Sequence, residues 1–210
     1  MAECSHCNEV LASPLACGGC ESIFEASSTL SPFEVFGLPL TARLDPSSLR
    51  KKLLQLQRLL HPDFHGAAGK VIQGIAEHNT AEVNAAFELL QDEALRAGWI
   101  VEYLGGPSKS SERHMPLDFL VEVMEWNETL EELKGEVDKD TAHKELNELK
   151  AVLQIQRAEL IENTLDNLEA KLRKAPNAPD LADIRRELNA VRYVDRALSE
   201  IASIELALAN

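Results

Sequence analysis

The sequence predicts an all-α fold. Aromatic residues make up only 5% of the 210 residues, whereas β-sandwiches and barrels depend on aromatic and β-branched side chains. Apolar residues recur at spacings of three and four over long stretches, which is the period of one helix face. With 45% apolar and 27% charged residues, the chain has the composition of a globular protein that buries a core. We therefore expect one or two compact helical units.

The formal net charge of −14 argues against two classes of partner. Nucleic acids and anionic membranes both attract a net-basic surface, so we expect neither as a partner. No apolar run approaches the ~20 residues that span a bilayer. The first residues, Met1-Ala2-Glu3-Cys4, resemble neither a signal peptide nor an Arg-rich transit peptide. We expect a cytoplasmic protein, with a mitochondrial location only if a presequence has been removed.

Residues 1–24 contain all the cysteines of the chain, in the pattern C-x2-C-x9-C-x2-C. Two such pairs can offer four thiolates to one tetrahedral ion, and a site closed by four ligands is structural rather than catalytic. We expect structural zinc, with an iron–sulfur cluster or disulfides as alternatives. Gly18 and Gly19 are expected to permit the turn of the second pair, and His6 is an alternative ligand. The predicted metal ligands are Cys4, Cys7, Cys17 and Cys20.

Two helix-start signals follow in the middle of the chain. Ser31-Pro32 predicts a helix of one or two turns, which Gly37 ends. Asp45-Pro46 repeats the signal before a longer helix. The leucines of that helix are spaced by four, three and four residues, which gives it one apolar stripe. This predicted core stripe consists of Leu49, Leu53, Leu56 and Leu60.

The tripeptide His61-Pro62-Asp63 ends this helix, because proline cannot continue the hydrogen-bond ladder. A second periodic stretch runs from about 67 to 90, so the tripeptide is predicted to lie in the loop of an antiparallel helix pair. The helix before the loop also carries the one concentrated basic stretch of this acidic chain. Its basic residues are Arg50, Lys51, Lys52 and Arg58.

Residues 31–105 resemble a J-domain. The resemblance rests on the segment Pro32-Phe33-Glu34-Val35-Phe36-Gly37-Leu38, the basic helix, the His-Pro-Asp (HPD) tripeptide, the segment Val83 to Leu90, and Arg96-Ala97. In that family the HPD loop and the basic helix dock on a DnaK-type heat-shock chaperone and stimulate its ATP hydrolysis. The resemblance implies that His61, Pro62 and Asp63 are the trigger, and that the electrostatic contact comes from Arg50, Lys51, Lys52 and Arg58. Phe64 departs from the family, because many members have a basic residue at this position.

Helical periodicity resumes after a predicted linker at 105–113. Breaks near 135–140 and 176–179 predict three helices, at about 116–134, 140–174 and 180–208. We expect an antiparallel three-helix bundle over 115–208, with a coiled-coil stalk as the alternative.

Two faces of the first of these helices are apolar. The predicted core stripe consists of Phe119, Val123, Trp126, Leu130, Leu133 and Val137. Leu117, Leu120, Val121 and Met124 lie on the opposite side and should be exposed, unless they pack on the preceding domain. In the last helix the core stripe consists of Leu181, Ile184, Leu188, Val191 and Leu198, and Tyr193 is predicted to point outward. Exposed apolar residues of this kind suggest a binding surface.

A J-domain followed by an acidic three-helix domain resembles the HscB family, the co-chaperones of iron–sulfur cluster biogenesis. Some members of that family carry a four-cysteine segment at the N-terminus. The resemblance implies an L-shaped molecule whose C-terminal bundle binds the scaffold protein IscU, on which the iron–sulfur cluster is cargo. The scaffold-binding residues would be Leu117, Leu120, Val121, Met124 and Tyr193.

The expected function is that of an adaptor between IscU and a DnaK- or HscA-type chaperone, without catalytic residues of its own. The sequence shows no nucleophile–base pair and no phosphate-binding loop, so we do not expect an enzyme. A J-domain protein for a different client and a thiol-based metal or redox sensor are the alternatives. The four-cysteine segment 1–24 is termed here the knuckle. Three roles of the knuckle stay open: it contacts the chaperone, it joins two copies into a homodimer, or it only stabilises the chain.

Overall fold

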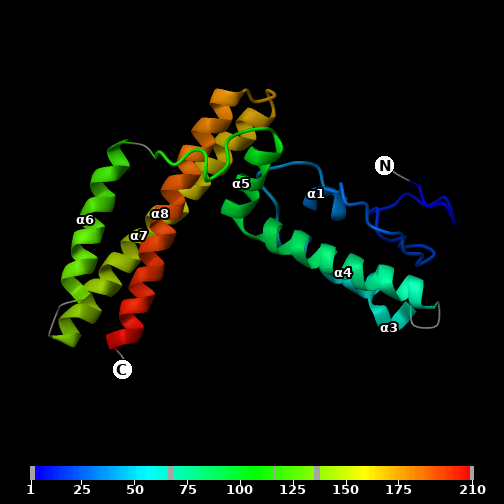
Figure 1. The fold of residues 1–210 in the computed structure, drawn as a ribbon, viewed down its shortest axis with the longest axis horizontal. Helices are drawn as coiled ribbons and strands as arrows, with labels where there is room; N and C mark the ends of the chain where they lie inside the picture. The colour runs from blue at the N-terminus through cyan, green and yellow to red at the C-terminus, as the bar shows by residue number, and fades with distance from the viewer. Residues whose placement is uncertain (1–2, 66–68, 116, 135–137, 209–210) are drawn as a thin grey trace. The chain divides into compact units, whose positions relative to one another are not determined.

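The computed structural model describes residues 3–65, 69–115, 117–134 and 138–208 (Figure 1). Within these ranges the chain forms helices and isolated β-bridges but no strand, which confirms the all-α prediction. The chain divides into two compact units, Met1–Arg96 and Ala97–Asn210. In the described part of the chain, no helix has the length and hydropathy that a membrane crossing requires.

A capping box starts the short helix α1 (Pro32–Val35). Ser31 Oγ accepts a hydrogen bond from Glu34 N–H at 3.2 Å, and Glu34 Oε2 accepts one from Ser31 N–H at 2.8 Å. Gly37 ends the helix as predicted, with a φ of 58°. A Cβ at this position would lie 2.0 Å from Ala12 O, so glycine also lets the N-terminal segment approach α1.

The antiparallel helix pair consists of α2 (Pro46–Leu60) and α4 (Lys70–Gln91). Gln57 is hydrogen-bonded to Asn84, while the later Leu60 accepts a bond from the earlier Thr80, so the two helices run in opposite directions. The leucine stripe is buried at Leu49, Leu56 and Leu60 and half-buried at Leu53, and from α4 the buried residues are Ala76, Asn79, Val83, Ala86 and Leu90. The predicted start of the second helix near 67 falls on residues 66–68, which lie outside the described ranges.

Two helices of the structure were not predicted. The turn α3 (Pro62–His65) follows α2 directly, and α5 (Glu93–Tyr103) follows α4. Arg96 in α5 is buried, and its guanidinium donates to Leu90 O at 2.5 Å and to Ala42 O at 2.9 Å. These bonds tie the start of α5 to the end of α4 and to the loop after α1.

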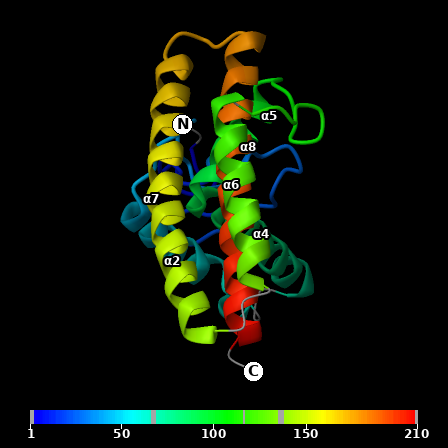
Figure 2. The same ribbon diagram turned by 90° about the vertical axis from the view of Figure 1, so that its left-hand side faces the viewer.

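The second unit contains the predicted three-helix bundle, formed by α6 (Leu117–Lys134), α7 (Lys139–Leu172) and α8 (Ala178–Leu208) (Figure 2). Ion pairs between Lys150 and Glu205 and between Arg157 and Asp195 join α7 to α8 in antiparallel register. The three helices share a cluster of buried residues, which is termed here the lower core. It comprises Met115, Phe119, Val123, Trp126, Leu130, Leu133, Ala142, Leu146, Leu153, Ala190, Val194, Ala197, Ile201 and Ile204. The predicted core stripe of α6 is therefore confirmed from Phe119 to Leu133, and Val137 lies outside the described residues.

The segment predicted as a linker is attached to α8 by two buried polar side chains. Arg185 donates to Pro107 O at 2.9 Å, and Asn189 donates to Glu112 O at 3.0 Å and to His114 O at 2.8 Å. Because buried donors must be paired, these bonds hold residues 107–114 against the helix. The segment that precedes α6 is thus part of the packed unit.

Candidate functional site

The four cysteine sulfurs meet near the N-terminus. The Sγ atoms of Cys4, Cys7, Cys17 and Cys20 lie within 4.8 Å of one another, and all four cysteines are free thiols. The closest pairs are Cys4 with Cys20, at 3.6 Å, and Cys7 with Cys17, at 3.5 Å. A tetrahedral ion with metal–sulfur bonds of about 2.3 Å would separate its ligand sulfurs by about 3.8 Å. The arrangement therefore fits a single four-coordinate ion and does not contain the alternative disulfides.

The two CxxC segments form matching turns. In each turn the first cysteine N–H donates to the carbonyl five residues later, at 2.8 Å from Cys4 to Glu9 and at 2.9 Å from Cys17 to Ser22. The residue after the second cysteine is left-handed in both, with φ of 61° at Asn8 and 58° at Glu21. This shared geometry directs two sulfurs from each turn to one point.

The expectation that Gly18 and Gly19 permit the second turn is wrong. Positive φ values occur at Asn8 and Glu21 but at neither of these glycines. A Cβ on Gly18 would meet no atom within 4 Å, and one on Gly19 would meet only the carboxylate end of Glu9. The left-handed conformation falls one residue after each cysteine pair, so the backbone does not require glycine between the cysteines.

Local groups favour the metal-binding form of one cysteine. Hydrogen bonding with the side chain and backbone of Ser22 lowers the pKa of Cys20 to about 6. Metals bind the thiolate, so this effect favours ligation at Cys20. At Cys7 the backbone of Glu9 lowers the pKa, but hydrogen bonding with Cys17 and the other cysteines outweighs this and raises the pKa to about 12.

The ring of His6 stacks on Phe24 with centroids 5.9 Å apart, so the side chain is occupied outside the four-sulfur cluster. The cluster thus supplies four sulfur ligands without His6.

Buried hydrogen bonds attach the knuckle to the helices of its own unit. Ser13 Oγ donates to Val35 O at 2.7 Å. Asn79 of α4 is fully buried; its Nδ2 donates to Phe24 O at 2.7 Å and its Oδ1 accepts from Ala26 N–H at 3.1 Å. The cysteine segment is therefore packed against the helix pair as part of the same compact unit.

The HPD tripeptide joins α2 to α3 in a hydrogen-bonded turn. His61 ends α2, and its carbonyl accepts a bond from Phe64 N–H at 3.0 Å. Asp63 N–H donates to His61 Nδ1 at 3.2 Å, so this imidazole nitrogen carries no proton in that arrangement. The Asp63 side chain is 89% exposed. The Asp63 carboxylate is thus exposed to solvent, while Pro62 and the hydrogen bonds of the turn restrict the backbone that carries it.

The predicted basic residues of α2 divide into two groups. Arg50, Lys51 and Arg58 are exposed. Lys52 is half-buried, and its Nζ donates to Phe36 O at 3.1 Å. The structure therefore places three of the four residues on the solvent side of α2 and assigns Lys52 a bond to the loop after α1.

The apolar patch of α6 is exposed where the structure describes it. The exposed fractions are 40% for Leu120, 61% for Val121 and 63% for Met124. The side chain of Leu117, the fourth predicted member, lies outside the described residues. Because core residues of the same helix are buried, this patch is a second apolar face.

The prediction that Tyr193 points outward is wrong. Tyr193 is half-buried and packs against the lower core of the bundle. The prediction included one apolar stripe on α8, but the structure buries a second one in the core shared with α6 and α7. That second stripe consists of Ala190, Val194, Ala197, Ile201 and Ile204, and Tyr193 lies roughly 60° from its centre at 100° per residue.

Tyr193 lies on the side of α8 that adjoins α6. His114, just before α6, is bonded to Asn189, and Lys134 at the end of α6 pairs with Glu200 at 2.7 Å. The two helices therefore run parallel, and Tyr193 is at the level of the first turns of α6. Its side chain is partly exposed.

Comparison with known proteins identifies the family. A family model described as the HSCB C-terminal oligomerisation domain matches residues 115–202. A "Co-chaperone protein HscB homolog" from Shewanella woodyi is 34% identical over 179 residues, which are 84% of this chain and 97% of the relative. This chain belongs to the HscB co-chaperone family.

Two further comparisons agree with the HscB family. An HscB homologue from Mannheimia succiniciproducens is 29% identical over 86% of this chain and 98% of its own length. The crystal structure of human co-chaperone protein HscB has the same fold, with a TM-score of 0.72 and 21% identity over 98% of this chain and all of that one. The Shewanella woodyi relative confirms the family resemblance found in the sequence, and the crystal structure confirms the fold.

Two exposed side chains of this HscB-family chain were missed as candidate site residues. Leu54 is 60% exposed and lies between Arg50 and Arg58 on α2. Phe64 is 71% exposed, and its ring meets that of His61 edge-on at 5.6 Å. Leu54 is a single apolar residue among exposed basic ones, so it breaks the amphipathic pattern of α2. This break in the sequence pattern could have identified Leu54 as a candidate.

Proposed function

We propose that this HscB-family chain is a co-chaperone that couples an iron–sulfur scaffold of the IscU type to a heat-shock chaperone of the DnaK or HscA type. One observation carries the proposal most directly. The exposed Asp63 carboxylate belongs to a hydrogen-bonded turn that directly follows α2. The exposed basic residues of α2, termed here its basic face, are Arg50, Lys51 and Arg58.

The HPD turn is suited to act as the trigger. A carboxylate held by a proline turn can form a charge-assisted hydrogen bond with an arginine of the chaperone. Its fixed backbone reduces the entropy that is lost when this bond forms. Asp63 would thus favour the chaperone conformation that hydrolyses ATP.

The basic face of α2 is suited to steer the encounter. Arg50, Lys51 and Arg58 form a local positive surface on a chain whose net charge is −14. Such a face attracts an acidic surface and raises the association rate. Leu54, exposed among these residues, would add apolar contact area at their centre.

The α6 patch is suited to bind the scaffold. Leu120, Val121 and Met124 are exposed on one side of α6, and methionine adapts well to an apolar partner surface. Tyr193 would border this patch through the exposed part of its ring. The scaffold would carry the iron–sulfur cluster as cargo, and the chain itself would perform no chemistry on it.

We also propose that the four-cysteine cluster holds structural zinc. The sulfur separations fit a tetrahedral ion, and four protein ligands leave no open coordination position. The ion would supply folding free energy to a segment that has few buried side chains.

Steady-state ATP hydrolysis by a purified DnaK-type chaperone tests the proposal, with and without IscU. We expect stimulation by this protein and its loss in Asp63→Asn, because the neutral amide cannot form the ionic bond. The double variant Leu120→Ala/Met124→Ala should lose only the stimulation that depends on IscU. Its matched control is Val152→Ala/Ile155→Ala, which removes two other exposed apolar side chains of the same unit.

The outcomes separate the parts of the proposal. Stimulation to which IscU adds nothing would leave the chaperone contact in place and contradict the scaffold assignment. Equal losses in the α6 variant and its α7 control would also contradict the scaffold surface. An absence of any stimulation would contradict the co-chaperone function itself.

A further inference from the structure

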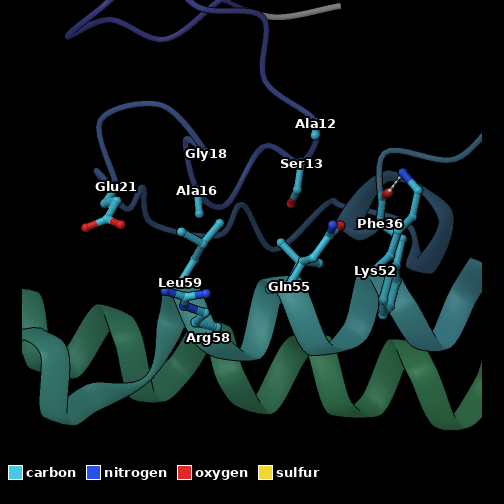
Figure 3. Close-up of a pocket in the computed structure, with 11 residues that line it drawn as sticks. Ala12, Ser13, Ala16, Gly18, Glu21, Phe36, Lys52, Gln55, Arg58 and Leu59 are labelled. Atoms are coloured by element: carbon cyan, nitrogen blue, oxygen red, sulfur yellow. Dashed lines mark hydrogen bonds between the residues drawn. The ribbon is translucent and has the colours of Figure 1, made fainter.

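A groove separates the cysteine knuckle from helix α2. It has a volume of about 470 Å³ and lies between the second CxxC turn and the side of α2 that carries Lys52, Gln55 and Leu59 (Figure 3). Gly18 and Glu21 come from the knuckle, and Gln55, Arg58 and Leu59 come from α2. Neither the metal cluster nor the HPD turn accounts for this groove.

A second hollow continues from the groove toward the HPD turn. It has a volume of about 450 Å³ and shares Glu21, Arg58 and Leu59 with the first. Its other lining residues are Phe64 and His65, which directly follow the HPD tripeptide. The two hollows thus form one surface, termed here the knuckle groove, which runs from Gly18 to Phe64.

The walls of the knuckle groove are fixed by hydrogen bonds. Ser13 is bonded to Val35 O on the knuckle side, and Lys52 is bonded to Phe36 O on the α2 side. At the other end, His65 Nε2 lies 2.7 Å from Leu59 O. A surface that is already formed loses little entropy when a partner binds.

We propose that the knuckle groove is part of the surface that binds the heat-shock chaperone, so that the second CxxC turn contacts that partner directly. The inference rests on the proposed function. The groove is continuous with the proposed chaperone contact, because Arg58 belongs to both the basic face and the groove, and Phe64 follows Asp63 in the chain. A protein that contacts both Arg58 and Asp63 also covers the surface between them, where Leu59 and Phe64 supply apolar area.

Charge favours this occupant over a second copy of the chain. Arg58 in the groove and Lys51 on the adjoining exposed face suit an acidic surface, while the Lys52 ammonium group is bonded to Phe36 O. Two copies of a chain with a net charge of −14 repel each other at long range. Glu21 is the one acidic residue that lines the groove in the described part of the chain, and it would face the acidic partner.

The substitution Gly18→Trp tests the inference. A Cβ at Gly18 meets no atom within 4 Å, so a side chain there does not distort the turn, and an indole at this lining position would obstruct a partner bound in the groove. The matched control is Ser5→Trp, because Ser5 holds the same position in the first CxxC turn and does not line the groove. We measure the dissociation constant for a purified DnaK-type chaperone and the zinc content of each variant.

We expect Gly18→Trp to weaken chaperone binding by about tenfold, because the added side chain clashes with the bound partner, while Ser5→Trp binds like the wild type. Both variants should keep one zinc per chain. Unchanged binding in Gly18→Trp would overturn the inference. Equal weakening in both variants would overturn it too, because the effect would then not come from the groove.

An Asp63→Asn arm distinguishes this inference from the proposed function. If Asp63→Asn abolishes stimulation and Gly18→Trp binds normally, the proposed function stands and the groove contact is wrong. If Asp63→Asn changes nothing, the proposed function itself is wrong and the inference falls with it.

Reversing the charge of Glu21 tests the groove contact independently. Glu21→Lys should tighten binding by about threefold, because it removes a repulsive carboxylate and adds an attractive ammonium group opposite an acidic surface. The control Glu88→Lys makes the same change in net charge at an exposed position on α4. Equal effects of the two substitutions would show that only net charge matters and would contradict a contact at Glu21.

Discussion

Asn79 shows how one polar side chain joins segments that are distant in sequence. It is fully buried in α4, and its amide pairs with the backbone of Phe24 and Ala26, more than fifty residues earlier. A buried amide that satisfies both a carbonyl and an N–H group replaces water on each of them. Asn79 therefore stabilises the end of the knuckle segment against the helix pair.

We predict that Asn79→Ala lowers the free energy of unfolding by about 2–3 kcal/mol, because two backbone groups lose their partner in a buried site. Urea denaturation measures the change. The control is Asn84→Ala on the same helix, whose exposed side chain is bonded to Gln57 and should cost less than about 0.5 kcal/mol. Similar losses in the two variants would contradict the role of Asn79.

Helix α2 depends on its first turn as well as on its leucine stripe. Asp45 accepts hydrogen bonds from Ser47 Oγ and from the N–H groups of Ser47 and Ser48. These bonds, above all the one from the Ser47 side chain, lower the pKa of Asp45 to about 2. The cap holds the start of the helix whose exposed side carries Arg50, Lys51 and Arg58.

This cap predicts a pH dependence with a definite sign. Because the pKa of Asp45 is lower in the folded chain, its stabilising effect is complete above the ordinary value of 3.8 and is lost as pH falls toward about 2. Asp45→Asn keeps a good cap acceptor that does not titrate. The stability advantage of the wild type over this variant should therefore shrink as pH falls.

Urea denaturation of both proteins at several pH values checks this prediction. The comparison cancels the titration of the other carboxyl groups, since both proteins share them. A constant difference from about pH 5 to pH 2.5 would contradict the cap as its source.

At the scale of the whole molecule, each of the two units has its own means of stability. The unit Ala97–Asn210 contains the bundle core, whereas Met1–Arg96 combines a small helical core with the four-cysteine knuckle. The knuckle contributes few fully buried apolar side chains, chiefly Leu15 and Ala16 with two of the cysteines. A bound ion should therefore matter to the first unit and little to the second.

Removal of the metal by a chelator tests this division. We predict that amide hydrogen exchange becomes faster in residues 4–24, because these turns lose the ion that closes them. Exchange in the paired stretches of α7 and α8 should stay unchanged, since their buried residues belong to a separate core. Unchanged exchange at residues 4–24 would refute a metal-dependent knuckle, and faster exchange throughout would refute the separation of the units.

The sequence by itself determined the features that depend on neighbouring residues. Apolar spacing predicted the long helices, and the cap residues Ser31 and Asp45 predicted two helix starts. The cysteine spacing predicted the sulfur cluster, and Pro62 predicted the end of α2. Each of these rests on contacts within a few positions or on a repeat along one helix, so a linear pattern carries the information.

Only the tertiary structure decided which partner each side chain meets. Lys52 is bonded to Phe36 O instead of joining the exposed basic face, and Tyr193 packs against the core because α8 buries a second stripe. Asn189 turns the predicted linker into a packed segment. These contacts join segments between sixteen and about eighty positions apart, and the knuckle groove likewise combines Gly18 with Phe64. Periodicity records which face of a helix is apolar, but the element that covers it is set by how the whole chain packs.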